Sequence, residues 1–277
     1  MDKFNKILKN IKEVKIQGAT AIAKVAAEAL MIKNKPQRLI SLRPTEPMLK
    51  NIVKLVSKDP KKNLPKVLKH IEDSRNKIIK YGANKIKNNS IVFTHCHSST
   101  VTAILKEATK KKKFEVYNTE TRPLFQGRLT AKELTQAGIK VTYFIDSGAR
   151  IALKKSDLFL IGADSINTNG EVINKIGSEM FAMIAGQYQV PVFVCTDSWK
   201  IDPDTLFGID TKIEKRSSKE VWPNAPKKVK IVNLAFEKVN SNLITGIISE
   251  LGILSPDNFV TEVKKNYPWI FSSGKRG

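Results

Sequence analysis

Short apolar runs alternate with helical stretches from about residue 88 onward, and this alternation constrains the fold more than any other feature. The runs are rich in β-branched residues and read SIVFTHC, FEVYNTET, VTYFI, DLFLIGAD, VPVFVCTD and VKIVNLAF. Helical patterns separate them at residues 100–109, 131–137 and 179–188. Strands and helices that alternate at this spacing form a parallel sheet with helices on both faces. The sequence therefore predicts a Rossmann-like, doubly wound α/β domain over residues 88–277.

Residues 1–87 have a different pattern, with no β-rich run. Apolar side chains recur about every 3.6 residues over 19–32, and residues 49–56 and 67–79 look similar. Between them, LRPTEP carries two prolines and indicates a turn or the start of a helix. We therefore expect a helical N-terminal domain over residues 1–87.

The net charge of +22 makes nucleic acid a partner to consider. Lysine supplies most of this charge and is spread along the whole chain, which favours a solvated surface over an anion-binding patch. We expect no nucleic-acid partner, although another anionic partner stays an alternative. Lysine interrupts every apolar stretch before about 18 residues, and the first residues lack an apolar signal region. The expectation is a soluble, cytoplasmic protein without a membrane partner.

The segment THCHSST lies at the turn from the first predicted strand to the next helix, and Cys96 ends that strand. Ser98 or Ser99 can cap the next helix, whose free amide groups attract an anion such as phosphate. A thiol beside a helix N-terminus has a lowered pKa and can carry a proton. Because neighbours in an extended strand point to opposite faces, His95 and His97 should face away from Cys96, and we expect no metal site. A buried structural cysteine is the alternative.

Asp164 directly follows the fourth predicted strand, in Gly162-Ala163-Asp164. Desolvation there raises the pKa of a carboxyl group and makes it a usable acid or base. Asn174 and Lys175 supply donors just before the next helix. Ligands of such sheets bind at the carboxyl ends of the strands, where both Cys96 and Asp164 fall. A helix cap and a surface turn are the alternative reading of this segment.

Other segments could hold phosphate. Two arginines and a glutamine lie in a loop shaped by proline and glycine, where a structural ion pair or a subunit contact is the alternative. The start of the alanine-rich helix offers free amide groups, with ordinary capping as the alternative. A lysine after the fifth strand could neutralise an enolate. The candidate binding residues are Gln17, Gly18, Ala19, Thr20, Arg43, Arg122, Gln126, Arg128 and Lys200.

Taken in order, THC followed by SS, ETRPLFQGRLTA, GADSINTNGEVINKIGS and NLITGIISELG resemble one known family from about residue 16 to residue 254. The family contains regulatory subunits of initiation factor 2B, methylthioribose-1-phosphate isomerase and archaeal ribose-1,5-bisphosphate isomerase. The resemblance implies a helical domain followed by a Rossmann-like domain, and a homo-oligomer that is a dimer or a trimer of dimers. The short length and the Leu42-Arg43-Pro44-Thr45 segment look most like the ribose-bisphosphate branch.

That resemblance implies an aldose–ketose isomerase that converts ribose 1,5-bisphosphate to ribulose 1,5-bisphosphate in AMP metabolism, without a cofactor. Cys96 and Asp164 match the proton-transfer pair of the isomerases. The substrate contacts of the ribose-bisphosphate branch map to the Gly18-Ala19-Thr20 turn, Arg43, Asn174, Lys175 and Lys200. A non-catalytic regulatory subunit and a methylthioribose-1-phosphate isomerase are the alternatives.

Two residues depart from the pattern of the isomerases. Gln17 stands where an arginine usually precedes the glycine, and His97 stands where an asparagine usually follows the catalytic cysteine. The first weakens or replaces a phosphate contact. Both departures bear on the identity of the substrate, and they are compatible with a non-catalytic relative.

Overall fold

A computed structural model describes residues 2–13, 18–43 and 46–272, so Gln17, Pro44 and Thr45 lie outside the described residues. Its N-terminal part is helical, as expected. Prolines occupy the first turns of three of these helices, where the missing N–H group costs nothing. The helices are α1 (Lys3–Lys12), α2 (Ala19–Ile32), α3 (Pro36–Ile40), α4 (Pro47–Val56) and α5 (Pro60–Lys85).

A seven-stranded sheet follows, in the order β11-β10-β7-β4-β1-β2-β3. All neighbours are parallel except β11, which runs antiparallel to β10. The six parallel strands have the doubly wound order, whose direction of winding reverses between β1 and β4. The strands are β1 (Ile91–Thr94), β2 (Glu115–Thr119), β3 (Lys140–Phe144), β4 (Leu158–Ile161), β7 (Val192–Cys195), β10 (Gly246–Ser249) and β11 (Gly252–Leu254).

Helices cover both faces of this sheet. Alternate residues of its strands point to opposite sides, so each face buries its own set of side chains. Val92 and Leu160 belong to the core beneath α5, α6 and α7, whereas Phe93 and Phe159 pack against the side that carries α8 and α9. The rings of Phe93 and Phe159 meet edge to face at 4.9 Å. Besides α5, the helices of this part are α6 (Ser99–Ala108), α7 (Gln126–Gln136), α8 (Ala149–Leu153), α9 (Ser178–Gln187), α10 (Pro256–Asn266) and α11 (Pro268–Phe271).

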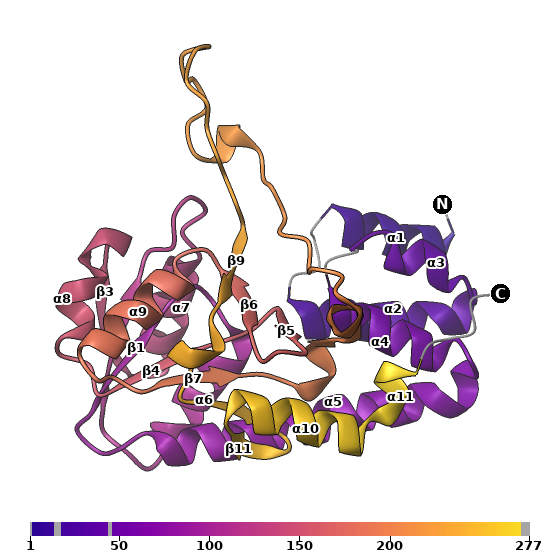
Figure 1. The fold of residues 1–277 in the computed structure, drawn as a ribbon, viewed down its shortest axis with the longest axis horizontal. Coiled ribbons are helices and arrows are strands. Elements are labelled where there is room, and N and C mark those ends of the chain that lie inside the picture. Colours follow the sequence, from indigo (N-terminus) through magenta and orange to yellow (C-terminus); the bar gives the residue numbers. More distant parts are fainter. Residues whose placement is uncertain (1, 14–17, 44–45, 273–277) are drawn as a thin grey trace.

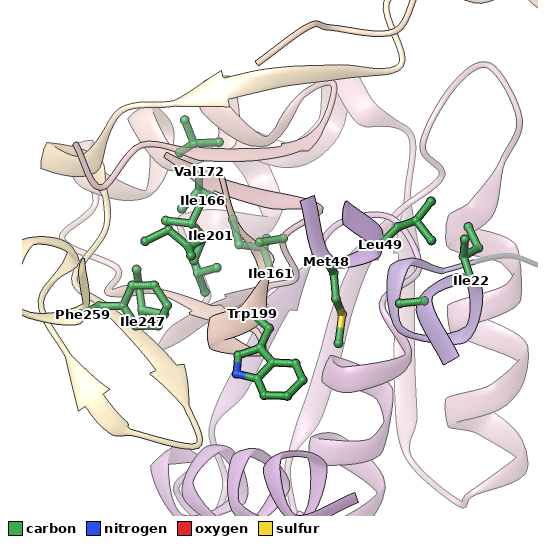
Figure 2. Packing of buried hydrophobic residues seen from close by; sticks show 14 of the residues in the cluster. Ile22, Met48, Leu49, Ile161, Ile166, Val172, Trp199, Ile201, Ile247 and Phe259 are labelled. Carbon is green, nitrogen blue, oxygen red and sulfur yellow. The ribbon is translucent and has the colours of Figure 1, made fainter. Parts of the chain in front are cut away.

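A second, smaller sheet lies between the large sheet and the N-terminal helices. Its order is β8-β5-β6-β9, with bounds Ile201–Asp202, Ser165–Asn167, Val172–Lys175 and Phe236–Val239. Figure 2 shows Ile161 and Trp199 between the apolar residues of the small sheet and the side chains of Met48, Leu49 and Ile22 from α4 and α2. The helical part and the sheets therefore share one continuous core.

The segment VKIVNLAF, predicted as a strand, does not join either sheet before Phe236. Residues 208–235 instead form an arm that projects from the body, orange in Figure 1, with an isolated bridge between Lys215 and Leu234. Val229 and Val232 are exposed there. The strand prediction was wrong because a β-branched pattern forms sheet only where a neighbouring strand offers an edge. The sixth parallel strand is β10, within NLITGIISELG. Within the described residues, no helix is both long and apolar enough to cross a membrane.

Candidate active site

A cavity of about 460 Å³ opens at the carboxyl end of the large sheet, where the winding reverses. Cys96 follows β1 and Asp164 follows β4, and these two strands are hydrogen-bonded neighbours. Both residues line the cavity, together with Gly18, Arg43, Arg122, Gln126, Asn174 and Lys175 from the predicted set. The fold thus brings a thiol and a carboxyl group to one space from positions 68 residues apart in the sequence.

The backbone at Cys96 is left-handed, with φ of 67°. Two threonines hold it there: Thr121 Oγ1 accepts from the Cys96 N–H at 3.0 Å, and Thr130 Oγ1 donates to the Cys96 carbonyl oxygen at 2.8 Å. Burial raises the pKa of the thiol to about 11, although the charge of Lys175 opposes the rise. The sequence-based expectation of a lowered pKa was wrong, because desolvation outweighs the charge of Lys175 and the hydrogen bond from the His97 main chain.

His95 and His97 also line the cavity, so the prediction that they face away from Cys96 was wrong. That prediction assumed an extended strand through Cys96, but β1 ends at Thr94. His95 is buried and its ring bonds to Thr119 Oγ1 at 2.7 Å and to the Ile176 carbonyl oxygen at 2.9 Å. Burial lowers its pKa to about 4. A neutral His95 is therefore a fixed part of the cavity wall at neutral pH.

Asp164 joins β4 to β5 and is surrounded by positive charge. Burial raises the pKa of its carboxyl group, whereas Lys200, Lys175 and Arg43 each act to lower it. Lys200 reaches this point from the turn after β7, and its ammonium group donates to the Ala163 carbonyl oxygen at 2.7 Å. Asn174 and Lys175 end β6 beside it, as the sequence placed them. The fold therefore holds a buried carboxyl group beside three cations.

The loop at residues 120–128 is fixed to the sheet by Asp146, whose carboxylate accepts from the N–H groups of Thr121 and Arg122 at 2.9 and 2.7 Å. Gln126 lines the cavity, and its buried Oε1 has no hydrogen-bond partner among the described residues. Arg128 is exposed and is not among the lining residues, and its guanidinium group stacks over the Phe125 ring at 3.9 Å. The loop therefore offers Arg122 and Gln126 to a ligand, but not Arg128.

The N-terminal helices contribute a second wall. Gly18 caps α2 with φ of 86°, and Ala19 is the first residue of that helix. The hydroxyl group of Thr20 contacts the sulfur of Met48 at 3.7 Å and is not among the lining residues. Arg43 lines the cavity and forms an ion pair with Glu46 at 3.0 Å.

Sequence reasoning missed several residues of the cavity. Glu46 begins α4, and the base of the arm adds an ionic group in which Arg216 pairs with Glu214 at 3.1 Å and with Glu220 at 2.7 Å. Glu214 also raises the pKa of Asp164. No sequence signal marks these residues, because Glu46 reaches the cavity only when α4 packs beside it, and the other three only through the path of the arm.

A separate cluster, whose residues do not line the cavity, lies between α5 and the ends of β7 and β10. His70 Nε2 lies 3.2 Å from Asp197 Oδ1, and Ser74 donates to Asp197 Oδ2 at 2.5 Å. His70, Asp197 and Glu250 are the one group of possible metal ligands found among the described residues, with ligand atoms within 4.8 Å of one another. Their hydrogen bonds to Ser74, Ser198 and Tyr267 satisfy these groups without an ion. The cluster anchors the turn that carries Lys200.

The chain belongs to the Initiation factor 2 subunit family, whose sequence model matches residues 15–256. It is 35% identical over 98% of its length to the ribose 1,5-bisphosphate isomerase of Methanocaldococcus jannaschii, and covers 97% of that protein. The ribose 1,5-bisphosphate isomerase of Archaeoglobus fulgidus is 33% identical, over 93% of this chain and 91% of that protein.

Solved structures share the fold. The translation initiation factor eIF-2B of Pyrococcus horikoshii OT3 superposes with a TM-score of 0.83 at 25% identity, over 94% of this chain and 99% of that one. The 5-methylthioribose 1-phosphate isomerase of the same organism gives a TM-score of 0.71 at 23% identity, over 95% and 88%. The second match supports the α/β fold alone.

Proposed function

We propose that this protein is an aldose–ketose isomerase that converts ribose 1,5-bisphosphate to ribulose 1,5-bisphosphate. The observation that carries the proposal is that Cys96 and Asp164 line one cavity at the point where the sheet reverses its winding. The two relatives named for this activity match the chain over more than nine tenths of its length. Their likeness supports the choice of sugar.

In this proposal the cavity residues move four protons. The ring oxygen gains one as the ring opens, C2 and its hydroxyl group each lose one, and C1 gains one, so that the protons balance. Cys96 starts as a donor, because its raised pKa keeps the thiol protonated at neutral pH. Asp164 is proposed as the acceptor, because a protonated thiol needs a base beside it; burial raises the pKa of Asp164, and Lys200, Lys175 and Arg43 oppose that rise. Each group contributes roughly 10²–10⁴-fold to the rate.

The two phosphate groups require positive charge and N–H donors around the proton-transfer pair. Arg43, Asn174 and Lys175 stand on one part of the wall, and Arg122 with Gln126 stands on the loop after β2. Lys200, beside Asp164, neutralises the enediolate that forms when C2 loses its proton. Binding both ends of the sugar fixes C1 and C2 against the acid and the base.

The direct test is to incubate the purified protein with ribose 1,5-bisphosphate and to follow ribulose 1,5-bisphosphate. We expect turnover by the wild type, and a loss of about 10²–10⁴-fold in kcat for Cys96→Ser with binding of the sugar retained. Cys195→Ser is the matched control, because Cys195 is buried in β7 away from the cavity. Full turnover by Cys96→Ser would remove the role of the thiol.

A second candidate is a non-catalytic regulatory subunit, favoured by the likeness to the initiation factor structure. A chain of that kind would bind initiation factor 2 in a pull-down and would leave ribose 1,5-bisphosphate unchanged. Assaying methylthioribose 1-phosphate in parallel separates the two isomerases. The free thiol at position 96 supports the enzyme over the regulator.

The protein is further proposed to act as a homo-oligomer. Apolar side chains are exposed on two neighbouring helices, with Ile151 of α8 60% exposed and Met183 of α9 60% exposed. A second copy would remove such side chains from water. Light scattering measures the oligomer, and a monomeric wild type would refute this part of the proposal.

A further inference from the structure

Glu46 lies in the cavity wall at the start of α4, and the proton-transfer scheme above gives it no role. Its side chain is only 6% exposed. Oε1 accepts a hydrogen bond from the Arg43 guanidinium group at 3.0 Å. Oε2 is buried and has no hydrogen-bond partner among the described residues. A buried carboxylate oxygen without a donor is costly, so this oxygen indicates a ligand that supplies one.

The charges around Glu46 restrict that ligand. Burial raises the pKa of Glu46, and the neighbouring carboxyl group of Asp164 raises it further, against the charges of Arg43 and Lys200. A phosphate group at Oε2 would bring further negative charge to a place where the carboxyl groups of Glu46 and Asp164 already lie close together. A hydroxyl group is both a donor and an acceptor, and can pair with a carboxyl group in either protonation state. A sugar hydroxyl therefore fits this place and a phosphate does not.

We propose that Glu46 is a specificity-determining residue, whose Oε2 binds a hydroxyl group of the sugar chain while Oε1 orients Arg43 toward a phosphate. Arginine has five N–H donors, so the ion pair with Glu46 leaves donors for that phosphate. Because Glu46 lies near Asp164, this hydroxyl group lies near C1 and C2, the carbons that exchange protons. It is therefore the hydroxyl group on C2 or the one on C3. The inference rests on the proposed function, because it names how the same cavity selects its sugar.

The test is calorimetric binding of ribose 1,5-bisphosphate and of its 2-deoxy and 3-deoxy analogues, in the Cys96→Ser background, where turnover is about 10²–10⁴-fold slower. With Glu46 present, one analogue should bind about 10- to 100-fold more weakly than the parent sugar, because Oε2 is left unpaired. Glu46→Ala should bring that ratio close to one. Glu46→Gln, which keeps an acceptor oxygen, should retain part of the discrimination, and a thermal melt of each variant confirms that it is folded.

Each other outcome contradicts the inference. Equal affinity for the parent sugar and both analogues with Glu46 present would overturn it without any Glu46 variant. A ratio that Glu46→Ala leaves unchanged would assign the discrimination to another residue. Failure to bind ribose 1,5-bisphosphate at all would overturn the proposed function and this inference together, whereas binding without discrimination overturns the role of Glu46 alone.

Discussion

The ammonium group of Lys200 donates a hydrogen bond to the main-chain oxygen of Ala163 at 2.7 Å, one residue before Asp164. Lys200 follows β7 and Asp164 follows β4, so this bond joins the ends of two neighbouring strands. The lysine charge favours the ionised carboxyl group, whereas burial opposes it. In the proposed mechanism, Lys200 therefore favours the form of Asp164 that can accept a proton.

Replacing this lysine should change the pH dependence of the reaction. In Lys200→Met the pKa of Asp164 rises further, so the acidic limb of the kcat/KM profile moves to higher pH and kcat/KM falls by about 10²-fold at neutral pH. Lys200→Arg keeps the charge and should keep the limb near its wild-type position. An acidic limb that stays in place in Lys200→Met would show that Asp164 is not the titrating base.

The thiol of Cys96 should react slowly with iodoacetamide near neutral pH. Its pKa of about 11 leaves little thiolate, so the alkylation rate should rise up to about tenfold for each pH unit between 7 and 10. Cys195 is 1% exposed and should stay unlabelled, and Cys96→Ser should abolish labelling. Mass spectrometry of quenched samples gives the rates. A rate that levels off below pH 8 would contradict the raised pKa.

The His70–Asp197 pair should stabilise the fold more at low pH than at high pH. Burial alone would lower the pKa of His70, but the hydrogen bond and the charge of Asp197 outweigh it and the pKa is raised. The contribution is therefore fully present below about pH 6.5, the value for an unfolded histidine, and is lost as pH rises through the folded pKa. His70→Gln should reduce the free energy of unfolding by about 1–3 kcal/mol at pH 6 and by less at pH 9.

Urea unfolding at both pH values measures this difference. Lys69→Gln, at an exposed neighbouring position of α5, is the control and should behave alike at both. Asp197 and Glu250 face His70: the pKa of Asp197 is lowered by its hydrogen bonds, and that of Glu250 is raised by burial. An equal loss at pH 6 and pH 9 would mean that His70 contributes by packing on Trp199, whose ring lies 3.6 Å away.

Gly127 should tolerate no side chain. A Cβ atom there would lie 1.8 Å from the Thr119 carbonyl oxygen, and this backbone cannot move without disturbing β2. Gly127→Ala should cost at least about 1–3 kcal/mol and lower activity through the displaced Gln126 loop. Gly186→Ala in α9, where a Cβ atom meets nothing within 4 Å, should instead stabilise by about 0.5–1 kcal/mol. Thermal melts of both variants decide the comparison.

Local patterns were sufficient for the elements that bury a regular face. Residues 19–32 form α2 with the predicted bounds, and the first five predicted strands form β1, β2, β3, β4 and β7. The carboxyl ends of parallel strands lie along one edge of a sheet. The sequence therefore also predicted that Cys96 and Asp164 lie at a common site, and both line one cavity.

What could not be predicted depends on contacts between distant segments. The strands of the small sheet have two to four residues, too few for a period to show. Glu46 looked like part of a turn, and its burial against Arg43 arises only when α4 packs beside the cavity. The left-handed backbone of Cys96 is likewise imposed by Thr121 and Thr130, from elements that follow it in the chain.

That backbone conformation limits which residues can ever replace Cys96. Left-handed φ is tolerated best by glycine, asparagine and aspartate, and worst by β-branched side chains. Glycine, asparagine or aspartate could therefore replace Cys96 with the turn unchanged. Valine, isoleucine or threonine would require Thr121 and Thr130 to change as well. The left-handed main chain therefore leaves this position few alternatives to cysteine.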